Sequence, residues 1–255
     1  MKILLISGHG AGDSGAVAKI KGKTYKEAAE AIVMVKKIKE QLAAYNVTVD
    51  IYPTERNAYE DAKAGNLQVD LSQYDYVLEI HFNACVKDLK GNGKVTGSEA
   101  FVTTTDKTKA VENDMLDCLA GIGLKKRSVK SHNYTVIYRA KTKGADSCLL
   151  EVCFIDDADD MAIYLKNKDN VAKAIACGLV KGYKLKKKGN SKKTLKKGAK
   201  VKIKSGAVDA NTNGKYKAFV YKTTYTVISI SGDYVTFGLN GVVTGKTRKS
   251  NCILV

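Results

Sequence analysis

Two histidines follow apolar runs at points where buried strands should end. His9 stands between two glycines directly after residues 3–6 (ILLI), and His81 closes the segment VLEIH. Open α/β sheets place ligand-binding side chains beyond the carboxyl ends of their strands. Two imidazoles and a carboxylate, with a fourth position left for water, are typical of a hydrolytic zinc site. His9 and His81 are therefore candidate metal ligands.

Three glutamates compete for the carboxylate position of such a site. Glu27 and Glu30 stand at the start of the helix expected after His9 and share one helix face, although acids in a first turn also complement the helix dipole without binding anything. Glu79 shares a strand face with His81 and could instead orient the imidazole of His81. Glu27 lies nearer the helix start, and so nearer the strand ends, which favours it.

A fourth glutamate, Glu151, lies in the apolar segment CLLEVCF. Burial there would raise the pKa of its carboxyl, which suits a general acid or base near neutrality. A strand residue facing solvent and a buried salt bridge are the two alternatives. His132, in the polar loop SVKSHNY, is expected at the surface or beside the substrate rather than on a metal.

Alternating strand and helix patterns predict how these side chains are positioned. The pattern predicts a three-layer α/β domain with a largely parallel mixed sheet. The expected helices cover residues 24–45, 55–64, 106–121, 157–164 and 167–183, and the expected strands cover residues 3–6, 47–52, 74–82, 97–103, 135–138 and 147–154.

After this domain, apolar residues recur at every second position, which is the period of a β-strand. Short strands are expected at residues 200–204, 217–221, 225–230, 234–239, 242–244 and 252–255, with a hairpin turn at Asn240-Gly241. They predict a small all-β barrel that needs no helix. The predicted domains are residues 1–182 and 198–255, joined by a lysine-rich linker at residues 183–197.

The net charge of +17 belongs to the C-terminal part of the chain. Residues 1–180 contain 25 Lys/Arg and 24 Asp/Glu, whereas residues 181–204 contain 12 lysines and no acidic residue. A basic segment of this kind can meet any polyanion, including nucleic acid, anionic lipid and acidic wall polymers.

The cysteines and the N-terminal residues indicate the cellular compartment in which the protein is made. The six cysteines contain no CxxC pair, and we expect all of them to be reduced, buried small side chains. Lys2 precedes only four consecutive apolar residues, too few for a signal peptide, and no segment is long enough to span a membrane. We expect a protein made in the cytoplasm that does not insert into membranes.

Four motifs together resemble a known enzyme family. ISGHGAGDSGA, a glutamate at a helix start, VLEIHFNA and LLEVCFIDDADD resemble the zinc-dependent N-acetylmuramoyl-L-alanine amidases of phage endolysins and bacterial autolysins, over residues 1 to about 182. The resemblance implies that His9, Glu27 and His81 bind Zn²⁺ and that Glu151 is the catalytic acid/base. Residues 127–130 (RSVK) are similar to an RxVK segment of the family that precedes a strand.

Two departures from the family pattern concern residues beside these ligands. SGHGAG replaces the usual DPGHGG, and Glu79 replaces a small residue. Neither departure removes a metal ligand, so both are expected to affect only the residues that surround the ligands. The last sixty residues resemble a bacterial SH3-like cell-wall-binding domain.

The resemblance also implies a function. We expect zinc-dependent hydrolysis of the amide bond between N-acetylmuramic acid and L-alanine in peptidoglycan. The missing signal peptide favours a phage endolysin, released to the wall through a phage pore, over a bacterial autolysin, which stays open. The expected partners are peptidoglycan and, through the basic segment, acidic wall polymers, not nucleic acid. The alternatives are a non-catalytic wall- or polyanion-binding protein and a zinc hydrolase of the same fold that cleaves another amide.

Overall fold

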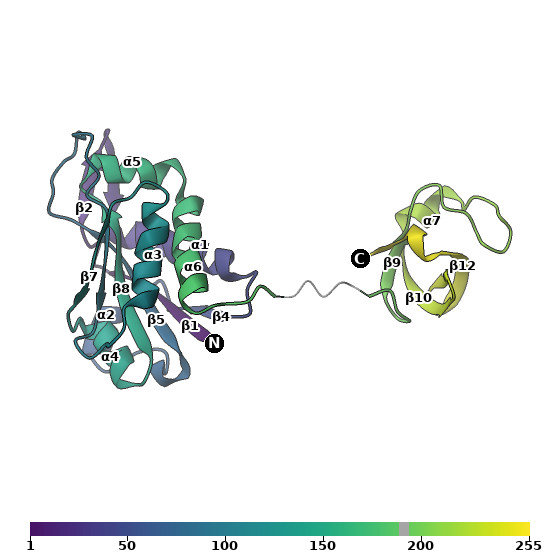
Figure 1. The fold of residues 1–255 in the computed structure, drawn as a ribbon, viewed down its shortest axis with the longest axis horizontal. Helices are drawn as coiled ribbons and strands as arrows, with labels where there is room; N and C mark the ends of the chain where they lie inside the picture. Colours follow the sequence, from purple (N-terminus) through teal and green to yellow (C-terminus); the bar gives the residue numbers. More distant parts are fainter. Residues whose placement is uncertain (189–193) are drawn as a thin grey trace. The chain divides into compact units, whose positions relative to one another are not determined.

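The computed structural model describes residues 1–188 and 194–255, which form two compact units, Met1–Lys187 and Lys188–Val255 (Figure 1). The division falls inside the segment predicted as a linker, residues 183–197, of which residues 189–193 lie outside the described part. Each unit is described separately below.

The first unit is built on a six-stranded sheet whose first four strands are parallel. β6 pairs antiparallel with β8, and the edge strand β7 is parallel to β6. The prediction of a largely parallel mixed sheet is therefore confirmed. Across the sheet the strands are β4 (Thr48–Ile51), β1 (Lys2–Ser7), β5 (Tyr76–Asn83), β8 (Asp146–Phe154), β6 (Ser98–Val102) and β7 (Lys126–Ser131).

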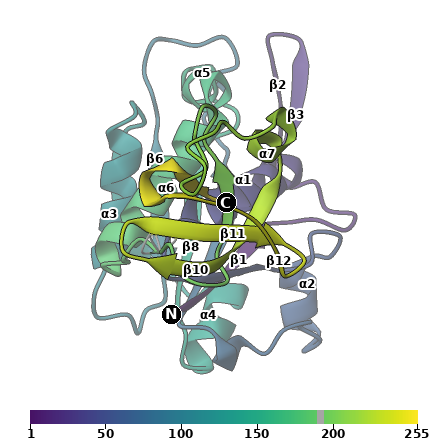
Figure 2. The same cartoon turned by 90° about the vertical axis from the view of Figure 1, so that its right-hand side faces the viewer.

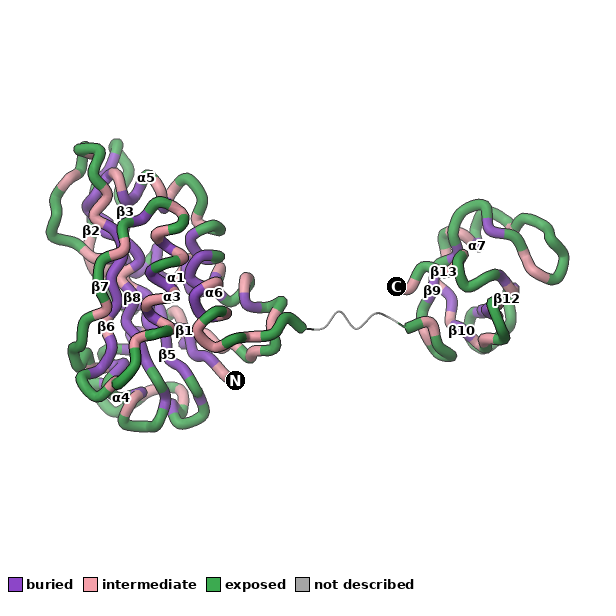
Figure 3. The backbone as a smooth tube through the Cα atoms, in the orientation of Figure 1, coloured by how far each residue is buried: buried purple, intermediate pink, exposed green. Residues whose placement is uncertain are grey.

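Helices cover both faces of this sheet and give three layers. The side chains of β1 alternate between two apolar cores, so Ile3 and Leu5 face one layer and Leu4 and Ile6 face the other. Figure 3 shows the resulting concentration of buried residues in the central strands. One layer holds α1 (Glu27–Leu42), α3 (Ala110–Ala120), α5 (Ala158–Lys166) and α6 (Lys168–Gly182), and the other holds α2 (Ala58–Lys63), the short 3-10 helix Leu71–Gln73 and α4 (Thr135–Thr142).

Three local predictions were wrong. The strand predicted at residues 135–138 is α4, because Val136, Ile137 and Ala140 bury one helix face against the sheet. The helix predicted from residue 24 begins at Glu27, after an unpredicted hairpin of β2 (Val17–Ile20) and β3 (Lys23–Lys26). Figure 2 shows this hairpin at the same end of the unit as α5. The RSVK segment forms β7 itself, an exposed edge strand without an apolar run, and α4 rather than a strand follows it.

The second unit is a five-stranded antiparallel sheet around a small apolar core. Asn240 and Gly241 have positive φ angles and make the predicted hairpin turn between β11 and β12. The strand predicted at residues 217–221 is the short helix α7 (Ala218–Lys222), so the expectation of a unit without a helix was wrong; Val220 of α7 packs into the core. The other elements are β9 (Lys200–Ile203), β10 (Thr224–Ser231), β11 (Tyr234–Leu239), β12 (Val242–Arg248), the 3-10 helix Lys249–Asn251 and β13 (Cys252–Leu254), in the sheet order β12-β11-β10-β9-β13.

The cysteines differ from expectation in their burial. All six are free thiols, but only Cys148 and Cys153 are buried, and Cys85 is exposed. Among the described residues, no helix has both the length and the apolar character needed to cross a bilayer.

α3 and α6 approach each other closely at Gly178. A methyl group placed on Gly178 would lie 2.3 Å from Met115 Cα, a backbone atom that cannot rotate away. This contact sets how closely the two helices pack beneath the sheet.

We expect Gly178→Ala to lower the free energy of unfolding by about 1–3 kcal/mol, because the added methyl must push α3 and α6 apart. Urea denaturation followed by circular dichroism measures the change. Lys173→Ala, on the exposed face of the same helix, is the control and should change the stability by less than about 0.5 kcal/mol. Equal stability of the wild type and Gly178→Ala would contradict the tight helix contact.

Candidate functional site

The strands that carry the predicted site residues are neighbours in the sheet. β1, β5 and β8 lie side by side and parallel, so their carboxyl ends meet at one edge. His9 follows β1, His81 lies near the end of β5, and Glu151 is the register partner of His81 on β8. The topology therefore brings together side chains that are far apart in sequence.

Two glycines make room for the imidazole rings. A Cβ on Gly8 would lie 2.3 Å from His81 Cε1, and one on Gly15 would lie 2.5 Å from His9 Cδ2. Gly15 also has a φ of +60°, which disfavours other residues. The glycines of the first motif thus serve the packing of the site as well as the turn.

Glu27 is the centre of the site. It is the first residue of α1, which the β2–β3 hairpin places over the strand ends, and its side chain is buried. Its Oε1 accepts hydrogen bonds from the backbone N–H of Phe82 (3.0 Å) and lies 2.9 Å from His81 Nδ1, while its Oε2 accepts from the N–H of Ala16 (2.9 Å) and lies 3.1 Å from His9 Nε2. Burial opposes ionisation of Glu27, but the contacts with His81 and His9 outweigh it and hold the pKa of the carboxyl well below its usual range.

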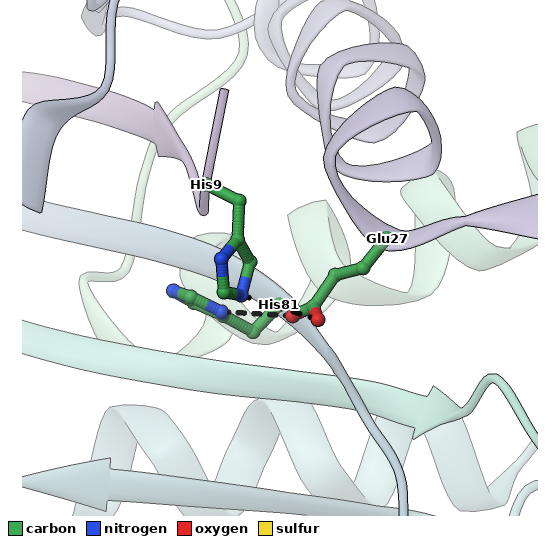
Figure 4. Close-up of side chains that lie close together, drawn as sticks. All are labelled: His9, Glu27 and His81. Atoms are coloured by element: carbon green, nitrogen blue, oxygen red, sulfur yellow. Dashed lines mark hydrogen bonds and ion pairs between the residues drawn. The ribbon is translucent and has the colours of Figure 1, made fainter. Parts of the chain in front are cut away.

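Each imidazole lies between two carboxylates, of which Figure 4 draws the shared one, Glu27. His9 Nδ1 is 2.7 Å from Asp13 Oδ2, on the side away from Glu27. His81 Nε2 is 3.4 Å from Glu79 Oε1, a close ionic contact without hydrogen-bond geometry. The hydrogen bond with Glu27 raises the pKa of His9; burial disfavours the charged form of His81, but its contacts with Glu27 and Glu79 still raise the pKa of that ring.

His9, Glu27 and His81 form a group that could hold a metal ion. One donor atom from each lies within 4.8 Å of the others, and the three side chains point toward one another in Figure 4. Two imidazole nitrogens and one carboxylate oxygen are a donor set that suits zinc. The predicted set is thus brought together, and metal binding by these residues stays a prediction.

Of the two other glutamates considered for the ligand position, Glu79 contacts His81 and Glu30 lies elsewhere. Glu30 is buried, accepts a hydrogen bond from Tyr164 Oη (2.7 Å) and pairs with Lys168. It therefore links α1 to α5 and α6 and does not reach the two histidines.

Glu151 differs from Glu27 in having no charged partner of its own. Its Oε2 is buried without a hydrogen-bond partner, and within the described residues Glu151 forms no salt bridge. Burial raises the pKa of its carboxyl to about 7, although the nearby His81 favours the ionised form. A carboxyl with such a pKa can accept and return a proton near neutrality.

Sequence analysis missed Glu99, a buried carboxylate beside Glu151. Glu99 is the antiparallel register partner of Glu151 and accepts hydrogen bonds from Arg127 Nε (2.9 Å), Lys130 Nζ (2.7 Å) and Asn83 Nδ2 (2.7 Å). Burial opposes its ionisation, but Lys130 and Arg127 lower the pKa of Glu99 below its usual value. The sequence signal that could have identified Glu99 was a single acidic residue inside the segment SEAFV.

A cavity of about 470 Å³ opens over these groups. Glu79, Glu151 and the two ring systems of His9 and His81 line one part of it. His132 is exposed and also lines the cavity, where its ring lies 4.4 Å from that of Tyr134; a role beside the substrate stays a prediction. The remaining lining residues were not singled out by sequence analysis; they are Asp13, Asn57, Tyr59, Asn133, Tyr134, Thr135, Val136 and Leu149.

Comparison with known proteins relates the fold to amidases. The catalytic domain of CwlV, an N-acetylmuramoyl-L-alanine amidase from Bacillus (Paenibacillus) polymyxa var. colistinus, is 25% identical, with a TM-score of 0.57 over 73% of this chain and 100% of that domain. The catalytic domain of an endolysin targeting Clostridia difficile is 21% identical (TM-score 0.55; 71% of this chain, 97% of that one), and the amidase AmiC2 of Nostoc punctiforme is 19% identical (TM-score 0.52; 71% and 97%). These two similarities show the fold alone.

A search among curated proteins found no match. The sequence profile of the Amidase_3 family, N-acetylmuramoyl-L-alanine amidase, matches residues 3–181, which include His9, Glu27, His81 and Glu151. The match covers nearly all of the first unit and well over half of the chain. The chain therefore belongs to the Amidase_3 family of N-acetylmuramoyl-L-alanine amidases, whose substrate is peptidoglycan.

Proposed function

We propose that this amidase depends on zinc and lyses bacterial cell walls as a phage endolysin. The observation that carries the zinc proposal is the convergence of His9, Glu27 and His81 beside Glu151, a carboxyl with a pKa of about 7. The endolysin role is supported by the motif pattern and by a second, basic unit suited to an anionic surface. The bond cut would be the amide between N-acetylmuramic acid and L-alanine.

Zinc would be held by His9, Glu27 and His81. When bound to such a donor set, zinc acts as a Lewis acid and lowers the pKa of water toward about 7. Asp13 and Glu79 contact the outer nitrogens of the two imidazoles and would fix their ring orientations. Glu27 would be ionised when it binds zinc, because the contacts with His81 and His9 and the N–H of Ala16 stabilise its charge.

Glu151 would carry the proton transfers. It lies at the cavity and has an oxygen without a hydrogen-bond partner, which leaves it free to accept a proton from water. It would then donate that proton to the nitrogen of L-alanine, since an amide nitrogen leaves poorly unless it is protonated. His132 and Tyr134, which also line the cavity, would contact the substrate beside the cleaved bond.

The second unit would hold the enzyme at its insoluble substrate. A five-stranded antiparallel sheet of about sixty residues is compatible with an SH3-like wall-binding domain. Tethering raises the local concentration of cleavable bonds. The site of action would then be the bacterial wall, reached through a phage pore, with peptidoglycan and acidic wall polymers as partners.

Removal of zinc should abolish lysis, and added zinc should restore it, because the ligands require a metal to act on water. Mass spectrometry of purified wall after digestion identifies the bond: a free L-alanine amino terminus is expected. Full lysis by a metal-free sample would contradict the zinc proposal, and a different new terminus would favour a hydrolase of another amide.

Variants of the three glutamates distinguish a ligand from its neighbours. We expect Glu27→Ala to lose bound zinc and activity, and Glu79→Ala to bind zinc roughly 10–100-fold more weakly because His81 loses an orienting contact. Glu30→Gln is the control and should keep its zinc, since Glu30 contacts Tyr164 and Lys168 instead. Zinc content and affinity are measured directly; a zinc-loaded Glu27→Ala protein would show that another residue is the ligand.

Glu151→Gln should retain zinc but lose activity by a factor on the order of a hundred or more. In the wild type, activity should fall as the pH drops below about 7, because the carboxyl of Glu151 then becomes protonated and cannot act as a base. Glu112→Gln is a matched control: burial also raises the pKa of Glu112, but it binds Tyr76 away from the cavity. If the Glu151→Gln variant lost its zinc, Glu151 would instead be a zinc ligand.

A further inference from the structure

Three lysines follow one another at alternate positions: Lys200 and Lys202 belong to β9, and Lys204 comes directly after its last residue, Ile203. Lys200, Lys202 and Lys204 are exposed, whereas Val201 and Ile203 between them are buried in the core of the second unit. Alternate residues of a strand point to the same face and stand about 6.6 Å apart. We call these three residues the β9 lysine ladder.

The charge of the ladder is not neutralised within the described residues. Lys200 Nζ donates a hydrogen bond to Thr226 Oγ1 (2.8 Å), and none of the three lysines pairs with a carboxylate there. Residues 198–255 contain only two acids, Asp209 and Asp233. Asp209 accepts hydrogen bonds from the backbone N–H of Asn211 in its own loop and from that of Lys246 on β12.

The two strands that flank β9 in the sheet, β10 and β13, place different side chains beside the lysines. On β10, Thr224 and Thr226 are the register partners of Lys202 and Lys200. Because Thr226 accepts from Lys200, its hydroxyl proton is free for another acceptor. On β13, Ile253 is the register partner of Lys202 and is 49% exposed. Positive charges thus run between a row of hydroxyls and an apolar side chain.

We propose that the β9 lysine ladder binds the phosphodiester groups of a linear polyol phosphate polymer of the cell wall. Such a polymer repeats one negative charge along a short polyol unit, which matches lysines at regular spacing between the threonine hydroxyls of β10 and Ile253. Each lysine would bind a phosphate as a compact point charge. This inference rests on the proposed wall-binding role of the second unit and specifies its ligand and its binding face.

Binding of the full-length protein to immobilised poly(glycerol phosphate) tests the proposal. We expect the triple variant Lys200→Gln, Lys202→Gln, Lys204→Gln to bind at least roughly tenfold more weakly at low salt, with the difference shrinking as salt rises. The matched control is Lys215→Gln, Lys217→Gln, Lys222→Gln, which removes the same charge from exposed positions outside β9. Its affinity should change less than about threefold.

Three outcomes would overturn the proposal. Equal losses in both triple variants would show a response to net charge rather than a site, and absence of wild-type binding would exclude the ligand. Tighter binding to duplex DNA than to poly(glycerol phosphate), at equal phosphate concentration, would assign the ladder to nucleic acid. Hydrolysis of a soluble muropeptide is measured alongside: both triple variants should retain it, and its absence in the wild type would contradict the amidase proposal while leaving the polymer result standing.

Discussion

The buried carboxylate of Glu27 is the interaction on which the catalytic unit depends. Burying a charge is costly unless donors replace the lost water. Here the N–H groups of Ala16 and Phe82 and the rings of His9 and His81 surround its two oxygens. These donors come from the loop after β1, the segment before the β2–β3 hairpin and the end of β5. One side chain therefore holds together the elements that would position a metal.

Glu151 shows what the same residue type does without such donors. Glu99, its neighbour on β6, collects the cations Arg127 and Lys130 as well as the amide of Asn83. Those cations are thereby engaged by another acid and do not act as direct partners of Glu151. Burial therefore disfavours the ionised form of Glu151, and the pKa of its carboxyl rises to about 7. Hydrogen-bond partners thus separate an ionised carboxylate suited to a cation from one suited to proton transfer.

The two units differ in net charge. Acidic and basic residues are nearly balanced up to residue 180, so the catalytic unit can bury carboxylates among compensating donors and cations. The second unit has few acids, and its lysines remain exposed on a sheet whose core is apolar. Such a surface gains little from intramolecular ion pairs and is available to an anionic partner.

Short-range patterns in the sequence were enough to predict the largely parallel sheet, because the buried strands β1, β5 and β8 are near-continuous apolar runs. They also singled out His9, His81 and Glu151, since polar residues beside or within apolar runs are conspicuous, whereas Glu27 was favoured for its position at the start of the expected helix. Patterns failed where packing outweighs local propensity: the β-branched residues of α4 form a helix, and the edge strand β7 has no apolar run. Tertiary structure alone decided that Glu30 turns to Tyr164 while Glu27 faces the histidines. It also placed Glu99 opposite Glu151. These contacts join residues far apart along the chain, so their geometry arises only when the sheet and its helices pack together.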